Sequence, residues 1–240
     1  MNQSVLDIST IGLLMALVLV LPVLVILYVW RLQAGKALYA VFRMVAQLLL
    51  VGYVLIFLFE QESAWVVGLV IFVMITASSW IALNTLESHR RQLFFNALIS
   101  ISVAGLFSLV LVSQGILQLE PWYEPRYVIP IAGMIFANAM NTVSIAVERL
   151  YSELKRDANY QEAKKIAFQA SMIPVTNSLF AVGLVSLPGM MTGQILSGVE
   201  PLVAVRYQIV VMCMIFGSAG IASAIFLVMS KKIFQIANVN

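Results

Sequence analysis

Long apolar runs separated by short polar segments dominate the chain. A membrane-spanning helix needs about 20 mostly apolar residues, and seven runs approach or exceed that length. They predict an all-α polytopic membrane protein with about seven transmembrane helices. The expected spans cover about residues 8–30, 37–59, 65–86, 93–117, 128–147, 172–198 and 203–229.

The sixth run contains residues that do not suit a regular helix. Its segment GLVSLPGMMTGQILSG, residues 183–198, holds four glycines and Pro188. Proline removes a backbone donor, and each glycine weakens a helix by roughly 1 kcal/mol. Backbone groups freed inside hydrocarbon need protein or water as partners. The pattern therefore predicts a helix broken at SLPG that lines a cavity or a subunit contact, as in many transporters. A kinked helix, or a loop just outside the bilayer, is the alternative.

The basic residues indicate the orientation. Twelve of the fourteen Lys and Arg residues fall on one predicted side of the membrane, and the positive-inside rule places that side in the cytoplasm. The N-terminus is then outside and the C-terminus inside. With 62% hydrophobic and 10% charged residues, the chain is far more apolar than a soluble domain. Its basic character is explained by these loops, without nucleic acid as a partner.

Residues 148–170 form the largest hydrophilic segment on the predicted cytoplasmic side. The sequence ERLYSELKRDANYQEAKKIAFQ has mixed charge and contains no proline or glycine. Glu162 and Lys165 stand three residues apart, which suits the surface of a helix. We expect a helix here that docks a soluble partner. A solvated helix linking two spans is the alternative.

The motifs that are missing narrow the function. The predicted span centres hold no aspartate or glutamate, although ion-coupled carriers usually keep such residues there. The metalloprotease, serine-hydrolase and P-loop motifs are also missing from the sequence. The sequence therefore does not favour an enzyme, and any nucleotide that drives the protein must bind another chain.

A set of polar and sulfur-containing residues remains within the apolar runs. Such groups line a pathway for a polar or ionic substrate, or else form hydrogen bonds between helices. Thioethers suit soft metals, but with no cysteine or histidine beside them core filling is favoured and no metal site is assigned. The pathway candidates are Arg43, Gln47, Asn138, Asn141, Pro188, Met190, Met191, Gln194 and Gln208.

Three segments resemble one transporter family. They are VFRMVAQLLLVGYVL (41–55), VIPIAGMIFANAM (128–140) and GLVSLPGMMTGQILSGVEPLVAVRYQIVV (183–211). They are similar to the FetB-type ABC permeases, an iron-export family that includes plant aluminium-tolerance relatives. The resemblance implies a single permease domain over residues 1–240 in the bacterial inner membrane. It also implies a homodimer with two cytoplasmic ATPase subunits, which bind the ATP and Mg²⁺.

The same resemblance suggests functional residues and substrates. By similarity to the coupling loop of ABC permeases, contact with the ATPase is carried onto Ala158, Glu162, Ala163 and Lys164. Family members tend to have an acid and a lysine where this chain has Asn177 and Phe180. If these positions contact the substrate or gate its path, this protein differs from its relatives in substrate or regulation. Export of iron or another metal ion is the first prediction. A nucleotide sugar or other polar solute, or a membrane anchor that transports nothing, are the alternatives.

Overall fold

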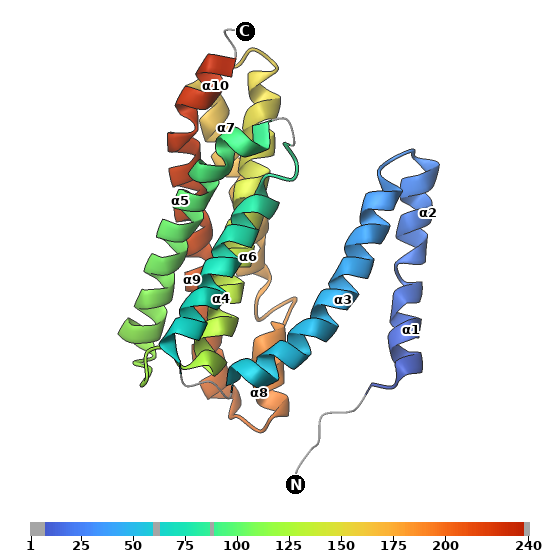
Figure 1. Cartoon of the computed structure of the whole chain (residues 1–240), viewed down its shortest axis with the longest axis vertical. Coiled ribbons are helices and arrows are strands. Elements are labelled where there is room, and N and C mark those ends of the chain that lie inside the picture. The colour runs from blue at the N-terminus through green and yellow to red at the C-terminus, as the bar shows by residue number, and fades with distance from the viewer. Residues whose placement is uncertain (1–7, 60–62, 87–88, 238–240) are drawn as a thin grey trace. The chain divides into compact units, whose positions relative to one another are not determined.

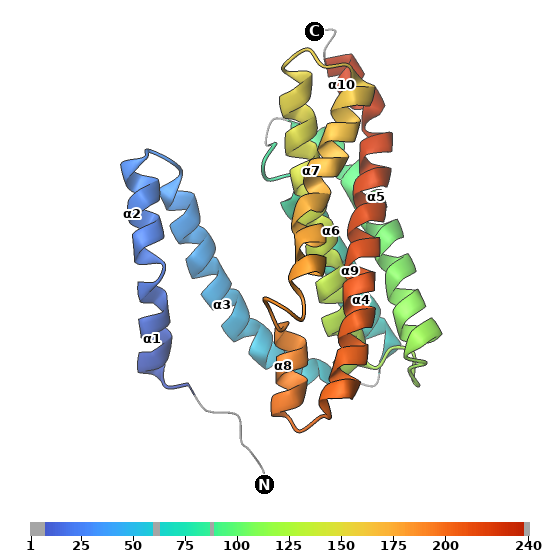
Figure 2. The ribbon, with the colours of Figure 1, turned by 180° about the vertical axis from the view of Figure 1, so that it is seen from behind.

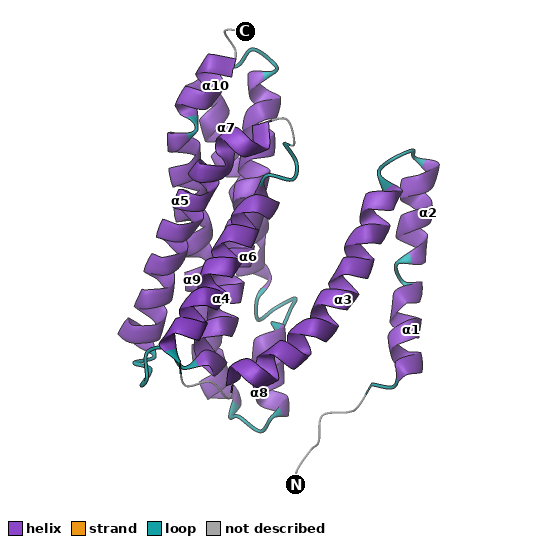
Figure 3. Ribbon diagram, viewed as in Figure 1, coloured by secondary structure: helices purple, strands orange, loops and turns teal. Residues whose placement is uncertain are grey.

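The computed structural model describes residues 8–59, 63–86 and 89–237. Within these ranges every regular element is a helix (Figure 3), so the predicted all-α fold is confirmed. The chain divides into two compact units, Met1–Gln61 and Glu62–Asn240. Each unit is described by itself below.

The first unit contains three helices, α1 (Thr10–Val18), α2 (Leu21–Val29) and α3 (Ala34–Phe59) (Figure 1). α1 and α2 are two halves of one apolar stretch, interrupted just before Pro22. A proline ring clashes with the carbonyl four residues earlier, and α1 accordingly ends at Val18. The first apolar run is therefore interrupted at this proline.

The second unit is a bundle of antiparallel helices (Figures 1 and 2). α5 continues into the π-helical segment η2 (Leu111–Ile116), and a turn separates α7 from α8. The helices are α4 (Ala64–Ala82), α5 (Arg90–Val110), α6 (Pro125–Leu154), α7 (Tyr160–Ala181), α8 (Gly189–Leu196), α9 (Pro201–Met229) and α10 (Lys231–Ala237).

Helix α6 lies at the centre of this bundle and packs against α4, α5, α7 and α9. Its buried side chains recur every three or four residues, and Phe136 is among the largest fully enclosed ones. Close packing of α5 against α6 requires glycine at position 105. A Cβ atom added there would clash with the Phe136 ring. Small residues that let helices approach closely are typical of membrane bundles.

One end of the bundle gathers most of the basic residues, and we call it the basic end. Contacts show that α4, α6 and α9 finish there and that α5 and α7 begin there. Arg90 donates from Nε and Nη2 to the Trp80 carbonyl, at 3.2 and 2.7 Å, and the Tyr160 hydroxyl donates to the Leu227 carbonyl. Nine Lys and Arg residues lie at this end: Arg90, Arg91, Arg149, Lys155, Arg156, Lys164, Lys165, Lys231 and Lys232.

Six stretches of described helix are long and apolar enough to cross a membrane. They are Thr10–Val29, Ala34–Phe59, Ala64–Ala82, Arg90–Ile116, Pro125–Leu154 and Pro201–Met229. α7 is not among them, because its first half carries charged residues. It nevertheless runs from the basic end alongside α6 and α9. The count of seven spans and the orientation stay predictions.

The segment 148–170 does not form one continuous helix, so that expectation is wrong. α6 ends at Leu154 and α7 begins at Tyr160, with a tight connection between them. Asn159 caps α7, because its Oδ1 accepts a hydrogen bond from the Glu162 N–H at 2.9 Å. An asparagine in extended conformation at this position stops helix propagation and satisfies a free donor. The segment is the meeting point of two antiparallel helices.

The buried Tyr160 hydroxyl provides a test of this meeting point. Burial raises the pKa of Tyr160 from 10 to about 12, so the folded protein favours the protonated phenol. Its contribution to stability is complete below pH 10 and is lost as the pH rises from 10 to 12. Replacing Tyr160 with Phe should cost about 1 kcal/mol at pH 8. The melting-temperature gap between wild type and Tyr160→Phe should narrow at pH 11, and a constant gap would contradict the assignment.

Candidate functional site

The break between α7 and α8 is a turn that satisfies its own backbone donors. The Ala181 carbonyl accepts hydrogen bonds from the N–H groups of the residues at 184, 185 and 186, at 3.2, 2.8 and 3.1 Å. The Gly183 N–H donates to the Ser186 carbonyl at 3.0 Å. Gly183 has φ of +84°, which an L-residue with a side chain rarely adopts. The predicted break at SLPG is therefore confirmed, and it needs no outside partner for these donors.

This turn lies at the level of the middle of the bundle. Its cavity-lining neighbour on α6 is Asn138, which is thirteen residues from the start of a 30-residue helix. Its neighbour on α9 is Met212, eleven residues from Pro201. At 1.5 Å per residue these positions lie about 20 Å and about 17 Å from the end opposite the basic end. The break therefore lies well inside the length of the bundle and not at either of its ends.

A cavity of about 290 Å³ lies beside the turn, enclosed by α6, α7, α9 and the turn itself. We call it the polar cavity. α6 contributes two asparagines and a threonine, while α7 contributes Ser178 beside Pro174. None of the described residues that line it is charged. Its lining is Asn138, Asn141, Thr142, Ile145, Pro174, Val175, Ser178, Val182, Ser186, Pro188, Met212 and Ile215.

Several polar groups of this cavity already use their donors on their own helices. The Thr142 hydroxyl donates to the Asn138 carbonyl at 2.9 Å, and the Ser178 hydroxyl donates to the Pro174 carbonyl at 3.0 Å. The Asn138 amide donates to the Met134 carbonyl at 2.8 Å. A hydroxyl has one proton but two lone pairs. The two hydroxyls can therefore offer a ligand only their oxygen lone pairs.

A second cavity, of about 360 Å³, lies between α7, the turn, α8 and α9. We call it the Gln208 cavity, after the one amide side chain that lines it. Val182 and Met212 line both cavities and form a common wall. The remaining lining residues are Leu179, Gly183, Leu187, Met191, Val205, Ile209 and Cys213.

The predicted pathway residues fall into three groups. Asn138, Asn141 and Pro188 line the polar cavity. Met191 and Gln208 line the Gln208 cavity instead. The others line neither: Met190 and Gln194 lie on α8, and Arg43 and Gln47 are exposed on α3 in the first unit.

The two positions that depart from the family pattern lie outside the polar cavity. Asn177 lines a separate groove between α7 and α9. The Phe180 side chain is exposed. Neither residue is among those that line the polar cavity in the described part of the chain.

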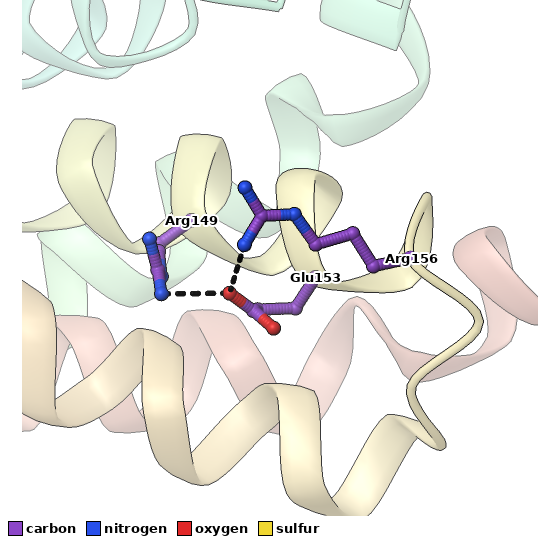
Figure 4. A network of polar contacts seen from close by, with 3 residues as sticks. All are labelled: Arg149, Glu153 and Arg156. Carbon is purple, nitrogen blue, oxygen red and sulfur yellow. Dashed lines mark ion pairs between the residues drawn. The ribbon is translucent and has the colours of Figure 1, made fainter.

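The residues expected to contact an ATPase lie at the basic end. Glu162 is exposed in the first turn of α7, and Ala158 and Lys164 are half-buried. Ala163 is fully buried, so its side chain packs inside the bundle. Beside them the nearly buried Glu153 carboxylate pairs with Arg149 at 2.7 Å and with Arg156 at 3.8 Å (Figure 4). This ion-pair network fixes the end of α6 against the connection to α7.

Sequence reasoning missed most of the residues that line the polar cavity. Ser178, Ser186 and Met212 were not predicted as lining residues. Ser178 has only a weak signal in the sequence, because a serine inside a helix commonly donates to the carbonyl three or four residues earlier whether or not it lines a cavity. Met212 has no comparable signal in the sequence, because its role depends on how α9 packs against the turn.

Known proteins similar to the chain are membrane proteins. The description "Uncharacterised protein family (UPF0014)" belongs to the family model that matches residues 10–234. The chain is 37% identical to the UPF0014 membrane protein slr1647 of Synechocystis, over 75% of this chain and 76% of that protein. It is 34% identical to Protein ALUMINUM SENSITIVE 3 of Arabidopsis thaliana, over 87% and 81%. It is also 34% identical to the "Probable iron export permease protein FetB" of Escherichia coli, over 91% and 89%. No solved structure matches the chain.

The conformation of Gly183 allows a direct test of the turn. Replacing Gly183 with Ala forces a side chain into the left-handed region and should cost roughly 1–2 kcal/mol of stability. Gly193 is a matched control, because it lies within helix α8 and a Cβ atom added there would have open space around it. Gly193→Ala should be neutral or slightly stabilising. Thermal unfolding in detergent measures both, and equal melting temperatures for the two variants would contradict the described turn.

Proposed function

The chain belongs to the UPF0014 family of membrane proteins, and from this premise we propose that it is the permease subunit of an ABC transporter. The observation that carries the proposal is the polar cavity beside a broken helix, near the predicted middle of the bilayer. Irregular backbone at this depth is typical of transport proteins, where it lines substrate sites. The similarity to a protein named as a probable iron export permease supports the same assignment.

The proposed transporter is a homodimer of this chain with two cytoplasmic ATPase subunits, which bind ATP and Mg²⁺. Each copy has seven spans, with α7 and α8 together forming the sixth. The N-terminus is outside, because the positive-inside rule assigns the basic end to the cytoplasm. The ATPase docks at that end, against Ala158, Glu162 and Lys164. Closure of the ATPase dimer moves the start of α7, and the polar cavity then opens to the other side.

The substrate best matched to the polar cavity is a metal cation, with iron as the first candidate. Hard cations are bound by oxygen ligands, including neutral carbonyl and hydroxyl groups. The lone pairs that Thr142 and Ser178 keep suit a cation or its water shell. A nucleotide sugar carries phosphates, which need donors or positive charge. The lining residues of the polar cavity include no lysine or arginine, so we place the nucleotide sugar second.

The first test measures substrate-stimulated ATP hydrolysis. The permease is purified with its candidate ATPase, in lipid, and titrated with ferrous iron, other divalent metals and nucleotide sugars. We expect stimulation by ferrous iron. Replacing Asn138 with Leu should raise the half-activating concentration about fivefold, because one buried polar contact contributes about 1 kcal/mol. Asn177→Leu is the control, since Asn177 lies outside the polar cavity.

The outcomes separate the parts of the proposal. Stimulation by nucleotide sugars alone would overturn the metal assignment. An equal effect of Asn138→Leu and Asn177→Leu would remove the polar cavity from the pathway. Failure of the two proteins to associate would favour a membrane anchor instead.

The second test addresses coupling at the basic end. Replacing both Glu162 and Lys164 with Ala should abolish the substrate-dependent part of ATP hydrolysis and leave the melting temperature of the permease within about 2 °C. The hydrogen bond that the backbone N–H at position 162 donates to Oδ1 of Asn159 survives this change. The control is Glu200→Ala with Arg206→Ala, which removes a charge of each sign near the start of α9. Undiminished stimulation in the Glu162 and Lys164 variant would refute the docking assignment.

A further inference from the structure

Gln208 is a buried polar residue whose acceptor has no partner. It lies in the second turn of α9, and only 6% of its surface is exposed. Its Oε1 atom accepts no hydrogen bond from any residue that the structure describes. Leaving a buried carbonyl unpaired has a free-energy cost comparable to a lost hydrogen bond. The cavity around Gln208 is therefore incomplete as the chain alone builds it.

The walls of the Gln208 cavity determine what can supply the missing donor. Besides Gln208, the lining side chains are aliphatic or contain sulfur, and none is charged. A buried water needs two to four polar partners. Gln208 is the single strong hydrogen-bonding side chain among the described lining residues. A water held by one carbonyl in an apolar cavity is poorly stabilised. A ligand that combines one hydrogen-bond donor with an apolar part would suit this cavity better.

The volume of the cavity limits the size of the apolar part of the ligand. A volume of about 360 Å³ equals about twelve groups the size of a water molecule, at about 30 Å³ each. This lies at the lower end of the range for small-molecule sites, which are mostly apolar with a few polar groups that orient the ligand. Several lining residues, including Val205 and Ile209, are also partly exposed on the outer face of α9. The cavity is thus open toward the surroundings of the helix.

We propose that the Gln208 cavity binds a single-chain amphiphile from the bilayer that carries one free hydroxyl group. The hydroxyl donates its hydrogen bond to Oε1 of Gln208. The alkyl chain lies against Leu179, Val205 and Ile209. The bilayer is the source, because a cavity open on the side of an apolar helix at this depth faces lipid. This site is separated from the polar cavity by Val182 and Met212, and it does not depend on the transport proposal.

The experiment uses the full chain in nanodiscs and a photoreactive decanol analogue. Mass spectrometry should locate the adduct on residues that line the cavity, such as Met191, Met212 or Cys213. Unlabelled decanol should compete about fivefold to tenfold better than decyl methyl ether, which has a similar chain but no donor. That ratio corresponds to one hydrogen bond. Labelling elsewhere, or equal competition by the alcohol and the ether, would overturn the proposal.

Three variants, one of them a control, test the role of Gln208 and of the cavity. Gln208→Leu should remove the preference for alcohol over ether, and its melting temperature should equal or exceed that of the wild type, because an unpaired polar group is lost. Gln194→Leu on α8 is the matched control and should keep the preference. Val205→Phe should narrow the cavity and reduce labelling there. If Gln208→Leu keeps the wild-type preference, or if Val205→Phe keeps the wild-type labelling, the site is not the one proposed.

Discussion

The need to satisfy backbone hydrogen bonds inside a bilayer governs this structure. A helix meets that need within its own segment, and an irregular stretch meets it only with help. The turn after α7 finds that help in itself, because the Ala181 carbonyl accepts from three following N–H groups. Gly183 makes the geometry possible through its positive φ. The chain can therefore interrupt a helix near the middle of the bundle without leaving these donors unpaired.

The same constraint explains how small polar residues are used in the second unit. Ser79, Ser100 and Ser108 are buried, and each hydroxyl donates to a carbonyl three or four residues earlier on its own helix. These serines act as small packing residues whose polarity is already satisfied. Ser178 makes the same kind of bond, but it lines the polar cavity, so its remaining lone pairs face open space. Whether such a serine is structural or functional depends on what lies beside it.

Sequence reasoning predicted the elements well and their associations only in part. Apolar length predicted the helices, and proline with glycine predicted the break at SLPG, because these are local effects. Of the predicted pathway residues, Asn138, Asn141 and Pro188 line one cavity, since two share a helix face and the third marks the break. Gln208 was grouped with them and lies in another cavity, because its position is set by the packing of α9. The helix expected over 148–170 was wrong, because helix-prone composition did not reveal the cap at Asn159.

Because the two cavities share a wall, movement at the break would change the volume of both. Val182 stands between the last helical residue, Ala181, and the left-handed Gly183, so its backbone belongs to neither helix. The turn is bonded chiefly to Ala181 and can move with the end of α7 without losing its own hydrogen bonds. A shift of Val182 toward one cavity enlarges the other, because the same side chain lines both. In the transporter proposed above, this turn is the candidate for the element that moves when access alternates.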